Sequence, residues 1–320
     1  MIDFRYHVVS IIAVFLALAL GLFVGSTSLQ DAVVHTISTK ADSVKHDNDA
    51  LTSQVHTLQG QVSASEKFDK ALLPYAVSGR LSGQLVSIVS APGTSESMRK
   101  QVIAAVDAAG GTVSADVRLQ NDLTDPTKDA FLSALAERVE IPGRPGDASA
   151  DGAQRAARQL ASVLGVRPSA RAVPAAAVDT ALSAYSTGKF ISLGNGVTTQ
   201  RPGTLAIILT GAAPSATADP RLVKAQQDFI LDLAGDLDGS ALGAVVAAPR
   251  PAPGTTTLDM TQAAGNVAGL TDRISTVSGV DTAAGQIAAV FALAAQADGT
   301  AGRYGPQSQL SPLPASSVAP

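Results

Sequence analysis

The chain opens on an almost unbroken apolar stretch at residues 8–24, and extension through Thr27 brings it to 20 residues. About 20 apolar residues of helix are enough to cross the hydrocarbon core of a bilayer. Arg5 is the only Lys or Arg before the stretch, and no Lys or Arg follows until Lys40. Because positive flanks stay in the cytoplasm, the pattern predicts a cytoplasmic N-terminus and an extracytoplasmic C-terminal part.

A cleaved signal peptide is the competing interpretation of this segment. The apolar region of such a peptide normally spans about 7–15 residues and ends in a small-residue cleavage site. Here the apolar run is longer, and the sequence after it, Val24-Gly25-Ser26, matches such a site poorly. The sequence therefore favours a retained single-pass anchor.

Apolar residues then recur in heptads, which predicts a coiled coil. Position d holds Ile37, Val44, Leu51 and Leu58, while position a holds Val34, Ala41, Asn48, Val55 and Val62. Val at a with Leu at d favours two parallel strands, and a single Asn at a fixes the register. We expect a parallel dimer or a higher oligomer held by Ile37, Ala41, Val44, Asn48, Leu51, Val55, Leu58 and Val62. The alternative is a monomeric amphipathic helix that folds back on the rest of the chain.

Strand-like and helical segments alternate after the coil. Residues 85–90 and 112–119 are expected strands, and the helical pattern at 97–109 between them predicts a right-handed βαβ unit with parallel strands. Further helices are expected at 127–139, 154–164, 174–186, 221–237 and 282–296, and further strands at 205–210, 242–248 and, more weakly, 190–193. The fold class is therefore α/β, a mostly parallel sheet with helices on both faces.

These patterns divide the chain into four parts. Residues 1–27 form the cytoplasmic N-terminus and the anchor, residues 28–67 the coiled coil, residues 68–304 an extracytoplasmic α/β domain, and residues 305–320 a Pro/Ser-rich tail expected to be disordered. Pro74 is expected to end the helix that leaves the coil.

Composition excludes several classes of function. The chain has 23 Lys and Arg against 27 Asp and Glu, so it lacks the basic excess of a nucleic-acid-binding protein. It has no Cys, and its four His all lie within the first 56 residues. Disulfides, thiolate metal sites and histidine catalysis in the α/β domain are thus excluded, and we expect the chain not to be an enzyme.

Two patterns in the α/β domain leave alternatives open. The segments after the strands, at 90–95, 194–197, 210–213 and 248–250, are rich in Gly, Ser and Thr, which donate to anions or simply form tight turns. No phosphate-binding glycine motif accompanies them. Asp228, Asp232 and Asp236 share a helix face that either binds a hard cation or faces water.

The coil offers one metal candidate. Asp42, His46 and Asp49 stand at i, i+4 and i+7, so their side chains share one helix face. Carboxylate and imidazole groups at this spacing either bind a metal ion or form a hydrated polar face. No resident cofactor is expected.

The N-terminal sequence Phe4-Arg5-Tyr6-His7-Val8-Val9-Ser10, followed by Ala13–Leu18, Gly21 and Gly25-Ser26, resembles the actinobacterial MctB family of copper transporters. Shorter likenesses occur at 108–111, 274–277, 280–285 and 303–305. The resemblance implies a membrane-anchored envelope protein with a role in copper transport or efflux and copper tolerance, and copper would be its transported ion. It implies no ligand set residue by residue. The alternative function is a non-enzymatic scaffold or regulator that binds an envelope or cell-division partner.

Overall fold

A computed structural model describes residues 4–139, 141, 150–171, 173–194, 197, 200–215, 217–252, 259–305 and 311–314. The chain divides into two compact units, Met1–Ser65 and Glu66–Pro320. Parts of two predicted segments, 194–197 and the tail from 305, lie outside the described residues. Within the described tail, Ser311 forms a parallel bridge with Tyr304.

The N-terminal helix α1 runs from Phe4 to Val77. Its segment Tyr6–Gly25 is long and apolar enough to cross a membrane, and none of it is buried within the protein. Pro74 lies inside α1, so the expectation that it ends the helix is wrong by about one turn. A proline removes one helical hydrogen bond, yet the last turn persists because Leu73, Ala76 and Val77 pack on the core of the α/β unit.

The α/β unit is built on one seven-stranded sheet in the order β3-β2-β1-β4-β5-β6-β7. All neighbouring pairs are parallel except β2 and β3, which are antiparallel. The predicted mostly parallel sheet is confirmed. Its strands are β1 (Leu85–Ser90), β2 (Thr112–Leu119), β3 (Ile191–Leu193), β4 (Leu205–Leu209), β5 (Gly243–Ala248), β6 (Ser275–Ser278) and β7 (Arg303–Tyr304).

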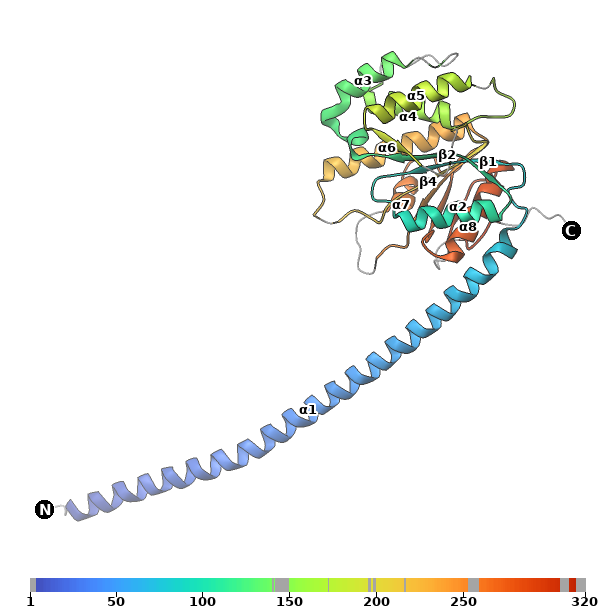
Figure 1. Cartoon of the computed structure of the whole chain (residues 1–320). Coiled ribbons are helices and arrows are strands. Elements are labelled where there is room, and N and C mark those ends of the chain that lie inside the picture. Colours follow the sequence, from blue (N-terminus) through green and yellow to red (C-terminus); the bar gives the residue numbers. More distant parts are fainter. Residues whose placement is uncertain are drawn as a thin grey trace. The chain divides into compact units, whose positions relative to one another are not determined.

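Helices cover both faces of the sheet, as the sequence predicts (Figure 1). One face carries α2 (Glu96–Ala108) and α8 (Ala283–Ala297). The other carries α3 (Asp129–Arg138), α4 (Gly152–Leu164), α5 (Ala175–Thr187), α6 (Pro220–Ser240) and α7 (Met260–Gly265), and two short 3₁₀ helices, η1 (Asn121–Thr124) and η2 (Pro126–Lys128), precede α3.

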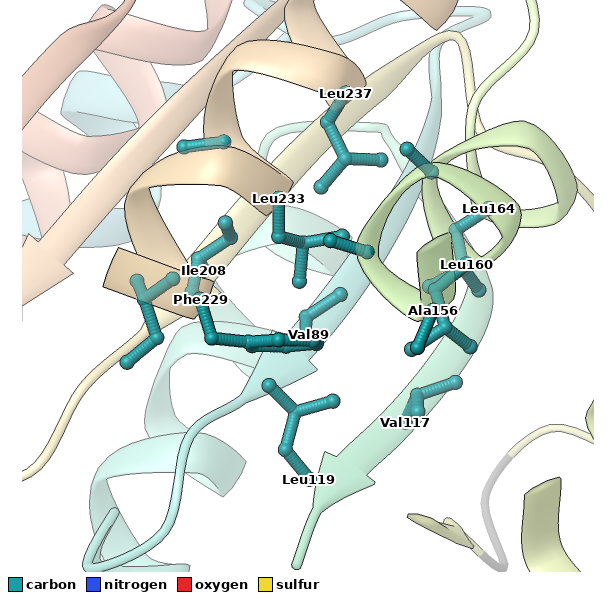
Figure 2. Packing of buried hydrophobic residues seen from close by; sticks show 14 of the residues in the cluster. Val89, Val117, Leu119, Ala156, Leu160, Leu164, Ile208, Phe229, Leu233 and Leu237 are labelled. Atoms are coloured by element: carbon teal, nitrogen blue, oxygen red, sulfur yellow. The ribbon is translucent and has the colours of Figure 1, made fainter. Parts of the chain in front are cut away.

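The hydrophobic core therefore has two layers, one on each side of the sheet. Every residue of β4 and β5 is buried, which accounts for their continuously apolar sequences. Figure 2 shows the layer under α4 and α6, where Phe229, Leu233 and Leu237 of α6 meet side chains of α4 and of the strands.

Candidate functional site

The carboxyl ends of β1 and β4 meet at the point where the strand order reverses, which is where open α/β sheets usually bind ligands. Here the two Gly-, Ser- and Thr-rich segments after β1 and β4 contact each other. Ala91 N and Thr94 Oγ1 donate to the carbonyl of Leu209, at 2.7 and 2.9 Å. A Cβ added to Gly211 would lie only 2.7 Å from Gly93 O. The small residues of these two loops therefore serve tight packing.

The loop after β5 is also tied down by its neighbours. Asp281 accepts hydrogen bonds from Arg250 N at 2.7 Å and from Arg250 Nε at 3.1 Å. Glu66 lies 3.3 Å from the same guanidinium group. Ion pairing within the unit thus occupies the one cation in this predicted loop.

A cleft of about 740 Å³ opens on the face of the sheet that carries α3 to α7. It lies between α6, the start of α4 and the segment from η1 to α3. Six aspartates and two arginines line it together with apolar side chains, namely Asp125, Asp129, Asp151, Asp228, Asp232, Asp236, Arg158 and Arg273. The cleft therefore has an excess of negative charge.

Three of these carboxylates hold the ends of helices. Asp125 accepts from Thr127 N at 2.9 Å, and Asp151 caps α4 by accepting from Gln154 N at 2.8 Å. Asp129 accepts from Gly152 N at 2.7 Å and so joins α3 to the start of α4. These three carboxylates stabilise helix starts and the junction of α3 and α4, and they also line the cleft.

The stripe on α6 supplies the other three carboxylates. Asp228 pairs with Lys224 at 2.7 Å. Burial raises the pKa of Asp232, and the nearby charges of Asp228 and Asp151 raise it further. Burial also raises the pKa of Asp236, where the attraction of Arg158 opposes it only in part. This face of α6 therefore lines the cleft. The folded structure disfavours the ionised forms of two of its carboxyl groups, those of Asp232 and Asp236.

The charge of the cleft favours a cationic group over an anionic one. Among the described residues, no group of three or more His, Asp or Glu side chains is placed to hold a metal ion. Of the six aspartates in the cleft, the sequence indicated only the three on α6. Asp125, Asp129 and Asp151 come from other elements, and only tertiary packing brings them to the same cleft.

A buried ionic cluster under α2 gave no signal in the sequence. Arg99 of α2 binds Asp116 of β2, and both side chains are almost fully buried. Arg99 also donates to both oxygens of Glu96, at 2.6 and 3.0 Å, which lowers the pKa of that carboxyl. Asp116 Oδ1 and the Nε of Arg118 are buried without a hydrogen-bond partner. Glu96 and Arg118 are the more exposed members of the cluster, and Arg118 Nη2 lies 3.7 Å from Glu96 Oε2.

The predicted contact residues of the coil lie exposed along α1 in this single chain. Val44, Leu51, Val55, Leu58 and Val62 are all at least 50% exposed. Ala41 and Asn48 are exposed as well, and the side chain of Ile37 lies outside the described residues. The apolar stripe is thus present and uncovered, whereas pairing with a second chain stays a prediction.

The candidate metal ligands Asp42, His46 and Asp49 are also exposed on α1. In the described part of the chain, no group of three or more His, Asp or Glu side chains could hold a metal ion, and these three side chains therefore do not form such a group. Met98 and Met260, the thioether groups outside the N-terminus, are buried in core layers on opposite sides of the sheet. They cannot share one soft metal ion.

Comparison with known proteins identifies the family. The sequence profile described as "Copper transport outer membrane protein, MctB" matches residues 1–314. The "Copper transporter MctB" of Mycobacterium bovis and that of Mycobacterium tuberculosis are each 29% identical to the chain over 302 residues, covering 92% of both sequences. The likeness thus includes the apolar helix, the heptad segment and the α/β unit. The chain belongs to the MctB family.

Proposed function

We propose that the chain is a membrane-anchored envelope protein that acts in copper transport and copper tolerance. The observation that carries the proposal is the family match from residue 1 to residue 314. The apolar helix Tyr6–Gly25 supplies the anchor, and Arg5 before it keeps the N-terminus in the cytoplasm. The α/β unit then lies outside the cytoplasmic membrane.

The coil holds two copies together in this proposal. Valine at position a, leucine at position d and one asparagine at a are typical of a parallel dimer. Two chains anchored in one membrane leave it in the same direction, which agrees with parallel pairing. The apolar stripe from Val44 to Val62 is exposed in the single chain, and a second helix would cover it.

Copper is a transported ion here and not a resident cofactor. Cu(I) prefers thiolate and thioether ligands, and the chain has no Cys. Its two methionines in the α/β unit are buried on opposite sides of the sheet. We therefore assign the copper route to an assembly of several chains, without tight chelation in one chain and without a catalytic step.

Deletion of the gene tests the role in copper tolerance. We expect the deletion strain to stop growing at lower copper concentrations and to regain tolerance with the full chain. A chain whose residues 1–27 are replaced by a cleavable signal peptide should not restore it. Normal copper tolerance in the deletion strain would contradict the proposal.

The same deletion strain distinguishes the role in copper transport from the alternative function, a scaffold for an envelope or cell-division partner. The observation that favours it is the close packing of the loops after β1 and β4, which fills the space between them at the edge where such sheets usually bind ligands. A defect in division or cell-wall shape with normal copper tolerance would support the scaffold.

Cysteine labelling tests the topology, because the natural chain has no Cys. Lys100, whose side chain is 70% exposed on α2, is a suitable position in the α/β unit. A membrane-impermeant maleimide should label Lys100→Cys in intact cells and Asp3→Cys only after lysis. Absence of Asp3 from the mature protein would show a cleaved signal peptide, and labelling of Lys100→Cys only after lysis would overturn the orientation.

A further inference from the structure

Three large apolar side chains are exposed on the last turns of α1, within the α/β unit. Phe68, Leu72 and Tyr75 are 67%, 42% and 81% exposed. Their spacing of four and then three residues places them on one helix face. Single exposed apolar residues are ordinary on protein surfaces, but three on one face form a stripe.

An adjoining side of the same turns is already covered. Leu73, Ala76 and Val77 pack against the core layer under α2 and α8. Val77 is fully buried. The end of α1 therefore has one face committed to its own domain and a second apolar face that the described part of the chain leaves open.

The heptads of the coil cannot continue unchanged to this point. After Leu58 at d and Val62 at a, an unbroken register would place Asp69 and Ala76 at position a. Asp69 would then face its own copy across the seam, a repulsive contact between like charges. Ala76 is unavailable to a partner helix because it packs on the core of its own domain.

A three-residue shift in the register resolves this conflict. The spacing from Leu58 onwards becomes Val62, Ser65, Phe68, Leu72 and Tyr75, in steps of four, three, three, four and three. Two consecutive steps of three are a stammer, which overwinds a coiled coil locally without breaking it. In this register the charged groups of Lys67 and Lys70 fall outside the seam.

We infer that Phe68, Leu72 and Tyr75 contact the same residues of a second copy, so that the dimer seam continues past the coil and into the α/β unit through a stammer. This inference rests on the dimer proposed above. The occupant is a second copy because the stripe follows the heptads of one continuous helix, and parallel pairing places each residue opposite itself. The two α/β units are then joined at their first helix.

Disulfide cross-linking of the full-length chain in membranes tests the inference. Single cysteines replace Phe68, Leu72 or Tyr75 in one set of variants, and Asp69, Lys70 or Ala76 in the other. Leu51→Cys in the coil is the reference. Disulfides need Cβ atoms about 3.5–4.5 Å apart, so after treatment with a copper-free oxidant such as diamide only seam positions should give covalent dimers.

We expect dimers from Leu51→Cys, Phe68→Cys, Leu72→Cys and Tyr75→Cys, and several-fold less from Asp69→Cys, Lys70→Cys and Ala76→Cys. Cross-linking at 69 and 76 but not at 68 and 75 would show an unbroken register and overturn the inference. Cross-linking at 51 alone, or equally at all positions including 70, would also overturn it. Failure at 51 as well would instead contradict the proposed dimer.

Discussion

Arg99 and Asp116 form a buried ion pair beneath α2, and Arg99 donates to Glu96 at the surface as well. Removal of one partner of a buried pair leaves the other charge without compensation. Asp116 is 1% exposed, so water does not hydrate its carboxylate in the folded chain. The stability of the α2 face therefore depends on the guanidinium group.

Arg99→Met is expected to lower the free energy of unfolding by about 3–5 kcal/mol, because it leaves a buried carboxylate unpaired. The double variant Arg99→Met/Asp116→Asn removes both charges and should be more stable than the single variant. Urea unfolding of the purified chain in detergent, followed by circular dichroism, measures both. Equal losses in the two variants would contradict a role for the charge.

Asp236 in the acidic cleft makes stability depend on pH. Because its folded pKa is raised above the ordinary 3.8, the folded state binds this proton more tightly than the unfolded chain does. Its contribution to stability is fully present below about pH 3.8 and is lost as the pH rises through the folded value.

Asp236→Asn should therefore be more stable than the natural chain at pH 7, and its advantage should shrink towards pH 4. Thermal unfolding at a series of pH values measures the difference. Asp122→Asn, at an exposed position outside the cleft, is the matched control and should show no such trend. An advantage of Asp236→Asn that is independent of pH would contradict the assigned cause.

At the scale of the element, α8 shows how a helix start is fixed by the loop before it. Thr282 Oγ1 accepts from Gly285 N at 3.1 Å and donates to Gly279 O at 2.8 Å. A Cβ added to Gly285 would lie 1.9 Å from the same Gly279 oxygen, so only glycine fits there. The cap by Thr282 and the close approach of Gly285 to Gly279 therefore fix where α8 begins.

Thr282→Ala should destabilise the α/β unit by about 1 kcal/mol through loss of the N-cap. For a unit of this size we expect the unfolding temperature to fall by roughly 2–4 °C. Thr282→Ser keeps the hydroxyl and should remain close to the natural chain. Calorimetry of the three proteins provides the comparison, and an equal loss in the serine variant would argue against the cap.

Two elements show where local pattern is insufficient. The sequence of β6, Ser-Thr-Val-Ser, lacks an apolar run, yet all four residues are buried. Its polar groups are satisfied from distant segments, for example Ser275 Oγ accepts from Gln296 Nε2 at 2.9 Å. Likewise, α1 continues past Pro74 because the core holds its last turn. Both results depend on contacts that are remote in sequence.

At the scale of the whole molecule, the proposed coil would set how many copies associate. Asn48 at position a favours a dimer at some cost in stability. We expect Asn48→Val to raise the unfolding temperature of the coil and to broaden the distribution of oligomers. Sedimentation of the chain in detergent measures this, with Ser53→Val on the outer face as the control.

A monomer before and after the Asn48 substitution would show that the heptad register is wrong. The acidic cleft belongs to the same scale, because its aspartates come from the caps of η2 and α4, from the start of α3 and from α6. Sequence spacing identified only the three on α6, since they alone follow a helical period. The others end or begin helices and reach the cleft through packing between helices.

The sequence by itself determined the apolar helix, the heptad stripe, the parallel α/β fold and the resemblance to the MctB family. Each of these depends on local periodicity or on side-chain types close together in the chain. The tertiary structure alone decided the closure of the β1 and β4 loops, the buried Arg99–Asp116 pair, the acidic cleft and the open face at Phe68, Leu72 and Tyr75. Burial and charge pairing between distant segments create these features, and local spacing gives only a part of them, such as the three aspartates on α6.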